Sequence, residues 1–548
     1  MEKRTLLAIL LTVILWTGWF LIFEKDQKNT QNIPPVQDQT TTADEKKTAT
    51  EAQKSVDNSV LTIPALKSVK EETLKLETGR FIFELTNKGA AINHVNYRER
   101  NIDLLFKEKF KSRGAMDFAI HFSEDEFLNG NSLAEAVWNF QKTDEKTIKF
   151  FTDIKLNGKP LRIEKTYQFT EKGYDFTVDY RIINTGKTPI QFRDNTVIFS
   201  SADILGPELD FTNRYNNMTG IYSVEGDYEQ NMKGGGVFSK PGGIKAETGS
   251  VDYTGIMSRY FLLIMKPKDF TGSSMIFDNR ADTGSRTGMK TEIKELAAGA
   301  QEARSFRIYL GEKDKEMLKS VDPMLVDASD VSTIIEPIRY FVVWALMWIN
   351  KLFGNLGWSL VVFSILTKFI FMPLTNKSTE SMKKMQELGP QIKKMQEKYK
   401  DKPEVAQREM MRIYKENNVS PLGGCLPLLL QMPFFFALYS ALINSIDLWN
   451  APFMLWVRDL SMPDTVATVA GFNINILPLL MTASTIIQQK QTMTDTGNQQ
   501  QKIMMYMMPV ILLFIFWSMP SGLVLYWFLQ NLYQVLHQTI VNHIGKKA

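Results

Sequence analysis

The sequence is poor in the side chains from which catalytic and metal sites are built. It contains one cysteine, Cys425, and four histidines among 548 residues. A single cysteine excludes an intramolecular disulfide and a CxxC metal site. Neither an HExxH zinc motif nor a GxxxxGK[ST] phosphate loop is present, which argues against metalloprotease activity and ATP hydrolysis. We therefore expect no enzyme, no cofactor and no metal site, and we expect His94 and His121 to be structural or exposed.

An excess of positive charge is also missing. The chain has 64 Lys and Arg against 60 Asp and Glu, a net charge of +4. Nucleic-acid recognition would need a clustered basic face, so we expect none. Residues 24–330 are polar, whereas residues 331–548 hold most of the long apolar stretches. This division predicts one part of the chain in water and another in lipid.

The N-terminal segment predicts a membrane anchor. Residues 5–23 are 19 residues without a charge, close to the ~20 that cross the hydrocarbon core as a helix. A cleaved signal peptide would end at a small-residue cleavage site, whereas Glu24-Lys25-Asp26 follows here. We expect residues 1–23 to form an uncleaved anchor. Residues 24–60, poor in apolar side chains, are expected to form a flexible tether.

Strand signals dominate residues 61–330. Apolar and polar residues alternate from Tyr174 to Ile182, the period of a half-buried strand. Asn157-Gly158 between apolar flanks is typical of a hairpin turn, and residues 184–187 (Asn-Thr-Gly-Lys) give a second hairpin signal. We expect residues 61–330 to form a large antiparallel β-sandwich.

Helical apolar patterns follow. Residues 334–353 are expected to form an amphipathic helix lying at the membrane interface, because their uncharged core is short for a span and Trp344 and Trp348 suit the headgroup level. A true span is the alternative. A helical core is expected over residues 354–548, with five spans at about 358–376, 420–444, 472–488, 503–518 and 521–541.

Basic residues predict the orientation of these spans. The loop 376–416 contains 11 Lys or Arg, whereas 444–472 contains only Arg458. Because short basic loops stay in the cytoplasm, we expect the first loop inside and the second outside. Both termini are then cytoplasmic, and the β domain lies on the opposite side of the membrane.

The basic loop has a helical pattern of its own. Leu388, Ile392, Met395 and Tyr399 recur at helical spacing, which predicts a cytoplasmic helical hairpin over 377–417. Two solvated helices packed on each other explain the pattern fully. Contact with nascent chains, the ribosome or the lipid surface is the functional alternative, indicated by the surplus of basic residues.

Lys368 is the most informative residue of the apolar region. It is the only charge between Trp358 and Lys377. Eight residues of helix rise ~12 Å, further than a lysine stem reaches, so snorkelling to the nearer interface does not free the ammonium from the membrane. Burial there costs at least ~3 kcal/mol on insertion scales, which predicts a water-filled cavity or a partner for this charge. None of the six predicted spans contains an acidic residue.

Polar residues on other spans indicate that water, and not a protein partner, stabilises the charge of Lys368. Asn531, Gln534 and Gln538 lie on one helical face of the last span, and Ser364 and Gln431 on two other spans face the same space in our interpretation. Ordinary hydrogen bonds between helices explain such residues individually. Together with an unpaired Lys368, they predict a hydrated groove.

Several short motifs carry a resemblance to a known family. The chain resembles the YidC/Oxa/Alb family of membrane protein insertases, in the form found in bacteria with two membranes, over about 338–542. The motifs are Gly354-Asn355-Leu356-Gly357-Trp358-Ser359, Phe371-Met372-Pro373-Leu374-Thr375, Ser420-Pro421-Leu422-Gly423-Gly424-Cys425-Leu426-Pro427, Gln431-Met432-Pro433, Ala451-Pro452-Phe453 and Met519-Pro520-Ser521-Gly522-Leu523-Val524-Leu525-Tyr526.

The resemblance implies a polytopic α-helical core of five spans in the bacterial inner membrane, preceded by the N-terminal anchor and the periplasmic β domain. The implied function is insertion and folding of nascent membrane proteins, alone or with the Sec translocon, with the lipid bilayer and the ribosome as further partners. Lys368 occupies a position where the family usually has Arg. The resemblance also implies substrate contact near Ser364, Met432, Phe435 and Trp527.

Two other functions are compatible with the residues alone. A secondary transporter of a small polar solute would use Lys368 and the glutamines, although the internal repeats typical of transporters are not found. A membrane-tethered periplasmic binding protein would need only residues 61–330.

Overall fold

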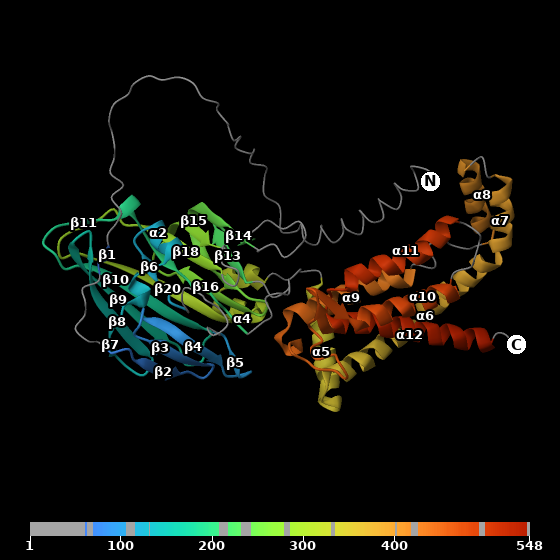
Figure 1. Ribbon diagram of the computed structural model, residues 1–548, viewed down its shortest axis with the longest axis horizontal. Helices are drawn as coiled ribbons and strands as arrows, with labels where there is room; N and C mark the ends of the chain where they lie inside the picture. The colour runs from blue at the N-terminus through green and yellow to red at the C-terminus, as the bar shows by residue number, and fades with distance from the viewer. Residues whose placement is uncertain are drawn as a thin grey trace, which may run out of the picture. The chain divides into compact units, whose positions relative to one another are not determined.

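The computed structural model describes residues 61–62, 70–105, 116–130, 132–207, 218–231, 243–278, 285–329, 335–399, 403–417, 426–492 and 499–544. The predicted anchor and tether, residues 1–60, and Cys425 lie outside the described residues. The chain divides into two compact units, a β unit made mainly of residues up to Leu310 and a helical unit made mainly of residues from Gly311 onward. Each unit is shown in Figure 1.

The β unit is built from short antiparallel strands with three small helices. Its strands are β1 (Leu61–Thr62), β2 (Thr73–Glu77), β3 (Phe81–Thr86), β4 (Ala91–Tyr97), β5 (Ile102–Asp103), β6 (Ile120–His121), β7 (Asn139–Lys142), β8 (Thr147–Leu156), β9 (Lys159–Phe169), β10 (Asp175–Asn184), β11 (Ile190–Gln191), β12 (Thr196–Ser200), β13 (Thr219–Val224), β14 (Asp227–Asn231), β15 (Ile244–Met257), β16 (Phe261–Pro267), β17 (Gly272–Asp278), β18 (Arg286–Glu292), β19 (Glu295–Leu296) and β20 (Gln301–Glu312). Helices α2 (Glu124–Asn129) and α3 (Ser132–Glu135), with the 3-10 turn η2 (Arg193–Asn195), connect them.

Fourteen of these strands form one sheet, whose main path runs β1-β8-β9-β10-β20-β16-β15-β17-β18-β12-β6. A second sheet of four strands has the order β2-β3-β4-β5. The core is aromatic. Phe199 lies 4.7 Å from Tyr180 and 5.1 Å from Phe306 between ring centroids, and Phe83 of the small sheet packs 4.5 Å from Phe169 of the large one. The predicted β-sandwich is confirmed.

The strand and turn predictions can be followed residue by residue. In β10 the side chains of Phe176, Val178 and Tyr180 are buried in alternation with more exposed neighbours, as the period of two predicts. Asn157 and Gly158 join β8 to β9, and both have positive φ. Two-residue hairpin turns favour this conformation, so the first hairpin prediction is confirmed. The second hairpin prediction was wrong.

Residues 184–187 do form a turn, in which Gly186 N donates to the Asn184 side chain at 2.9 Å. The following strand β11 pairs with β19 and not with β10. The edge of β10 is already occupied by β9 on one side and β20 on the other, so the chain leaves the large sheet after the turn.

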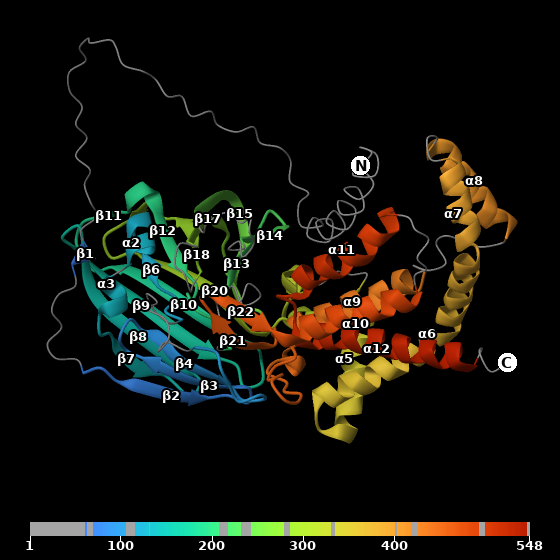
Figure 2. The ribbon, with the colours of Figure 1, turned by 45° about the vertical axis from the view of Figure 1, so that its right-hand side comes forward.

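The helical unit contains the long apolar helices. Its elements are α4 (Lys315–Val321), η4 (Pro323–Ser329), α5 (Glu336–Phe353), α6 (Leu356–Glu387), α7 (Gly389–Lys398), α8 (Pro403–Glu416), α9 (Leu426–Asn444), η5 (Ile446–Leu448), β21 (Thr465–Val469), β22 (Phe472–Asn475), α10 (Ile476–Thr492), α11 (Gln499–Phe516) and α12 (Ser521–Ile544). Figure 2 shows α9, α10, α11 and α12 running alongside one another.

Two differences between the helix boundaries and the predicted spans have a clear cause in the chain. Helix α6 continues without a break to Glu387, past the predicted end of the span at 376, because no helix-breaking residue follows Pro373 until Gly389-Pro390. The predicted span 472–488 begins with a strand, since residues 472–475 belong to β22. Among the described residues, Leu356–Pro373 is long and apolar enough by composition to cross a membrane.

Helix α5 is amphipathic, as predicted for residues 334–353. Val342, Leu346 and Ile349 are buried on one face, whereas Trp344 and Trp348 on the other are more than half exposed. The helix ends at Gly354, which adopts the left-handed conformation (φ 63°) that terminates helices.

Candidate functional site

Lys368 and Gln534 meet between two helices. Lys368 lies in α6 and donates a hydrogen bond of 2.6 Å from Nζ to Oε1 of Gln534 in α12. Gln534 is buried, and Lys368 is half-buried. Two of the predicted site residues, from spans far apart in the sequence, therefore lie in direct contact.

Gln530 and Thr367, which the sequence analysis did not select, make a second contact between α6 and α12 beside this bond. Gln530, one helical turn before Gln534, donates from Nε2 to the carbonyl oxygen of Ser364 at 2.9 Å and to Oγ1 of Thr367 at 3.2 Å. The spacing of four between Gln530 and Gln534 was the available signal. We call Ser364, Thr367, Lys368, Gln530 and Gln534 the Lys368 site.

The Ser364 hydroxyl is directed to its own helix. It is fully buried and donates to the Leu360 carbonyl oxygen at 2.7 Å, a bond common for serines inside helices. Its contribution to the Lys368 site is therefore its backbone carbonyl.

The remaining predicted polar residues have different neighbours. Asn531 donates to the hydroxyls of Ser484 (3.2 Å) and Thr485 (2.8 Å) on α10, the bonding between helices that was the simpler interpretation. Gln431 of α9 donates to the Tyr526 hydroxyl at 3.0 Å. Gln538 is buried farther along α12.

Aromatic side chains gather beside these polar residues. Trp527 of α12 lies 5.2 Å from Phe435 of α9 and 5.3 Å from Phe516 of α11, measured between ring centroids. We call these three residues the aromatic cluster. Phe435 and Trp527 were predicted substrate contacts, whereas Phe516 was missed. Met432, the other predicted contact on α9, is half-buried.

The charge of Lys368 is not matched by an acid. Across the described part of the helical unit, the ion pairs join other residues, and none includes Lys368. A hydrogen bond to a neutral amide satisfies one donor of an ammonium group, which has three. The site therefore presents a net positive charge to whatever approaches it.

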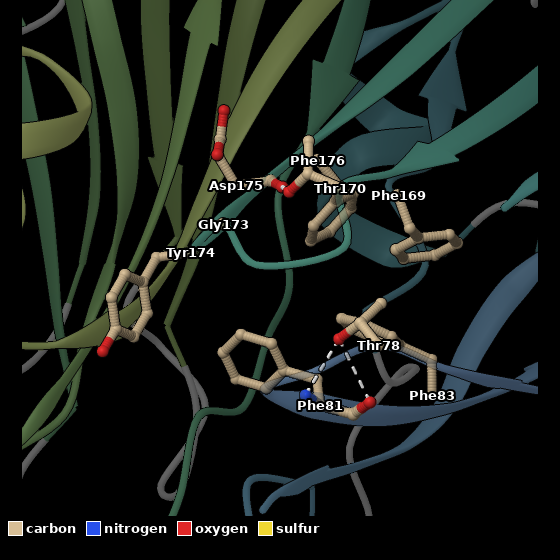
Figure 3. Close-up of a pocket in the computed structure, with 9 residues that line it drawn as sticks. All are labelled: Thr78, Phe81, Phe83, Phe169, Thr170, Gly173, Tyr174, Asp175 and Phe176. Atoms are coloured by element: carbon tan, nitrogen blue, oxygen red, sulfur yellow. Dashed lines mark hydrogen bonds between the residues drawn. The ribbon is translucent and has the colours of Figure 1, made fainter. Parts of the chain in front are cut away.

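The described part of the β unit contains a small aromatic pocket. The residues that line this pocket are Thr78, Phe81, Phe83, Phe169, Thr170, Gly173, Tyr174, Asp175 and Phe176. Figure 3 shows aromatic rings around this pocket and the Thr78 hydroxyl bonded to Phe81. The Thr170 hydroxyl donates to the Asp175 carbonyl oxygen at 2.6 Å. Its hydroxyls are thus used within the fold.

The two histidines of the β unit have ordinary structural partners. His121 is buried and its Nε2 lies 3.0 Å from Oγ of Ser200, while His94 faces Asp103 at 3.2 Å. In the described ranges of the chain, no group of three His, Cys, Asp or Glu side chains is arranged to hold a metal ion.

Two buried cations of the β unit, Arg286 and Lys165, have partners within the fold. Arg286 bonds to the carboxylates of both Asp117 and Asp203, and all three side chains are at least nine-tenths buried. Lys165 donates to the carbonyl oxygens of Ala90 at 3.0 Å and Asp117 at 2.6 Å. Burial lowers the pKa of Lys165 to about 7, an effect that the nearby negative charge of Asp117 opposes.

Comparisons with known proteins identify families that match both parts of the chain. A family described as "60Kd inner membrane protein" matches residues 348–548, and one described as "YidC periplasmic domain" matches residues 73–344. The fold and these matches define an inner-membrane protein with a periplasmic β-sandwich domain and a C-terminal helical region.

Relatives of full length narrow the assignment. Membrane protein insertase YidC of Leptospira interrogans (strain 56601) is 29% identical over 616 residues, covering 100% of this chain and 98% of the relative. The Treponema denticola insertase is 29% identical and both chains are covered completely. The chain belongs to the YidC family of membrane protein insertases.

Two solved structures are similar to this chain at low sequence identity. An active YidC insertase with its first transmembrane domain resolved matches with 18% identity and a TM-score of 0.36, covering 87% of this chain and 94% of that one. A galactose mutarotase-like protein from Lactobacillus casei matches 44% of this chain and 100% of its own, with 12% identity and a TM-score of 0.32.

Proposed function

We propose that this chain inserts nascent membrane proteins into the inner membrane and assists their folding, with Lys368 as the charge that receives the polar tail of the client. The observation that carries this proposal is the contact of Lys368 with a neutral amide, Gln534, instead of an acid. An unmatched cation in an apolar helix is costly unless water or a client provides partners.

The proposed membrane arrangement has five spans in the helical unit, with α5 at the periplasmic interface. The exposed Trp344 and Trp348 of α5 support that placement. The 11 basic residues of the loop 376–416 support a cytoplasmic position for α7 and α8. A groove between α6, α9 and α12 would then open toward the cytoplasm, next to Lys368 and the aromatic cluster.

A physical route for insertion follows from these positions. Carrying polar groups through dry hydrocarbon costs several kcal/mol for each unsatisfied group. A hydrated groove that reaches halfway through the membrane shortens the dry path, and Lys368 attracts acidic residues of the client tail. The apolar segment of the client moves into lipid along α9 and α11, and its burial there drives release.

Several partners are part of this proposal. Nascent membrane proteins are the clients, and the Sec translocon is a further partner. The basic surface of α7 and α8 suits the ribosome and anionic lipid. The alternative of a small-solute transporter has no support among the relatives described above.

Reconstitution tests the function directly. The purified chain is placed in vesicles of phosphatidylethanolamine and phosphatidylglycerol, and a short client with one apolar segment and an acidic tail is synthesised in their presence. We expect protease protection of the client tail only in vesicles that contain the chain. Protection equal to that in empty vesicles would reject the proposal. Vesicles with a Lys368→Ala chain serve as the matched control.

A further inference from the structure

A small hairpin in the helical unit has two chemically different faces. Strands β21 and β22 are joined by Ala470 and Gly471, both at positive φ, and pair Ala467 with Ile474, Thr468 with Asn473 and Val469 with Phe472. Because side chains alternate along a strand, one face carries Ala467, Val469, Phe472 and Ile474. The opposite face carries Thr468 and Asn473, whose side chains are hydrogen-bonded at 2.7 Å.

The apolar face is open. Val469 is 60% exposed and Phe472 is 61% exposed. The neighbouring side chain is Trp517, at the end of α11, whose ring lies 5.3 Å from that of Phe472. Its indole nitrogen donates to the Asn473 carbonyl oxygen at 3.0 Å, which fixes the ring beside the hairpin.

The hairpin continues directly into a helix that is short for a membrane span. Helix α10 has 17 residues and ends in the polar segment from Gln488 to Thr492, whereas ~20 apolar residues are needed to cross the hydrocarbon core. No charged residue occurs from Thr465 to Gln489. The hairpin adds about 10 Å of uncharged chain to the end of α10, since each strand residue advances ~3.3 Å. Figure 2 shows β21 and β22 leading into α10.

We propose that the hairpin Thr465–Asn475 is a membrane element, with Val469, Phe472 and Trp517 in the lipid interface at the end of α10. This proposal rests on the proposed position of α10 as a span. The surface of α10 also supports lipid as the partner of the hairpin. Leu479, Leu480 and Ile487 of this helix are exposed, and in a membrane span such apolar side chains face lipid. Aromatic side chains are favoured at the headgroup level, where water can still reach the outer backbone groups that a two-stranded hairpin leaves without ladder partners.

Fluorescent probes on the two faces test this placement. In a Cys425→Ser background, single cysteines are introduced by Val469→Cys and by Thr468→Cys, labelled with the environment-sensitive dye NBD, and reconstituted in phosphatidylethanolamine and phosphatidylglycerol vesicles. We expect the probe at 469 to emit at shorter wavelength and to be quenched several-fold more strongly by brominated acyl chains than the probe at 468. Aqueous iodide should show the opposite preference. Ala467→Cys, on the apolar face, provides a second position if the first variant folds poorly.

Two results would overturn the proposal. Equal iodide quenching at both positions would place the hairpin in water. Shielding of the probe at 469 from both quenchers would mean that protein, either a second copy or another chain, covers the face. Client insertion is measured in the same vesicles, so that failure of the insertase proposal can be told apart from failure of the hairpin proposal. If bromolipid quenches the probe at 469 but no client is inserted, only the insertase function is contradicted.

Discussion

Arg286 in the β unit and Lys368 in the helical unit are both cations removed from bulk water, but their surroundings differ. Arg286 is bonded to two carboxylates, Asp117 and Asp203, so its charge is neutralised within the fold. Lys368 is bonded to a neutral amide. A neutralised cation stabilises or specifies a structure, whereas a cation left without a counter-charge remains available to bind an acidic group from outside.

The largest effect is expected from removing the free charge. Lys368→Ala should abolish complementation in cells depleted of the endogenous insertase, because the function proposed above uses this cation to attract acidic client tails. Lys368→Arg should complement, since it keeps the charge. Growth and client insertion measure both. Lys490→Ala, at the exposed end of α10, is the control and should be neutral; an active Lys368→Ala variant would show that the charge is not required.

Giving Lys368 an acidic partner should neutralise it, as Asp117 and Asp203 neutralise Arg286 in the β unit. Gln534→Glu places a carboxylate where the amide oxygen now accepts the 2.6 Å bond, and the resulting ion pair should lower insertion nearly as far as Lys368→Ala while protein levels stay normal. Gln491→Glu, near the end of α10, is the matched control.

Exchanging Lys368 and Gln534 tests whether the site needs its positive charge or the lysine at this one position. The double variant Lys368→Gln with Gln534→Lys moves the cation to α12 and should recover part of the activity in the complementation assay. Full activity of Gln534→Glu would mean that the net charge of the site is irrelevant.

Removing the matched cation should affect stability instead of insertion. Arg286→Met leaves two buried carboxylates side by side, and loss of one partner from a buried ion pair costs about 3–5 kcal/mol. We expect a lower unfolding temperature of the full chain in detergent, followed by near-UV circular dichroism. The combination Arg286→Leu, Asp117→Asn and Asp203→Asn should recover most of the loss. An unchanged unfolding temperature in Arg286→Met would contradict the structural role.

The smallest effect, measured over a single pH unit, is a pH dependence from Lys165. Its pKa is lowered to about 7 in the folded protein from an ordinary 10.5, so between these values unfolding takes up a proton. Stability contributed by this group therefore rises with pH from about 7 to 10.5, with a slope of about 1.4 kcal/mol per pH unit. Urea unfolding at several pH values should show a flatter dependence for Lys165→Met than for the wild type. Lys142→Met, at an exposed position, should keep the wild-type slope.

The candidate site was partly predictable because charge is rare in apolar sequence. Lys368 stands out in its helix, and Gln534 lies on the polar face of α12 that the spacing identified. Asn531 did not join it. Three residues of helix turn the side chain by about 60° from its starting direction, which is enough for Asn531 to face α10 while Gln534 faces α6.

Contacts between distant segments account for what was missed. Gln530 bonds to Ser364 and Thr367 of α6, and Phe516 packs against Trp527 of α12. These contacts, which join different helices, give the two residues their place in the site. The hairpin before α10 was absorbed into the predicted span because its uncharged residues continue into the helix.

The sequence by itself determined the division into a water-soluble β part and an apolar helical part, the alternation of β10, and the isolated charge at residue 368. These features depend on composition and on periods within one segment. The tertiary structure decided that Gln534 and not an acid meets Lys368, that two acids meet Arg286, and that Asn531 turns to α10. Such pairings depend on which faces of distant segments pack together, and local spacing does not fix that.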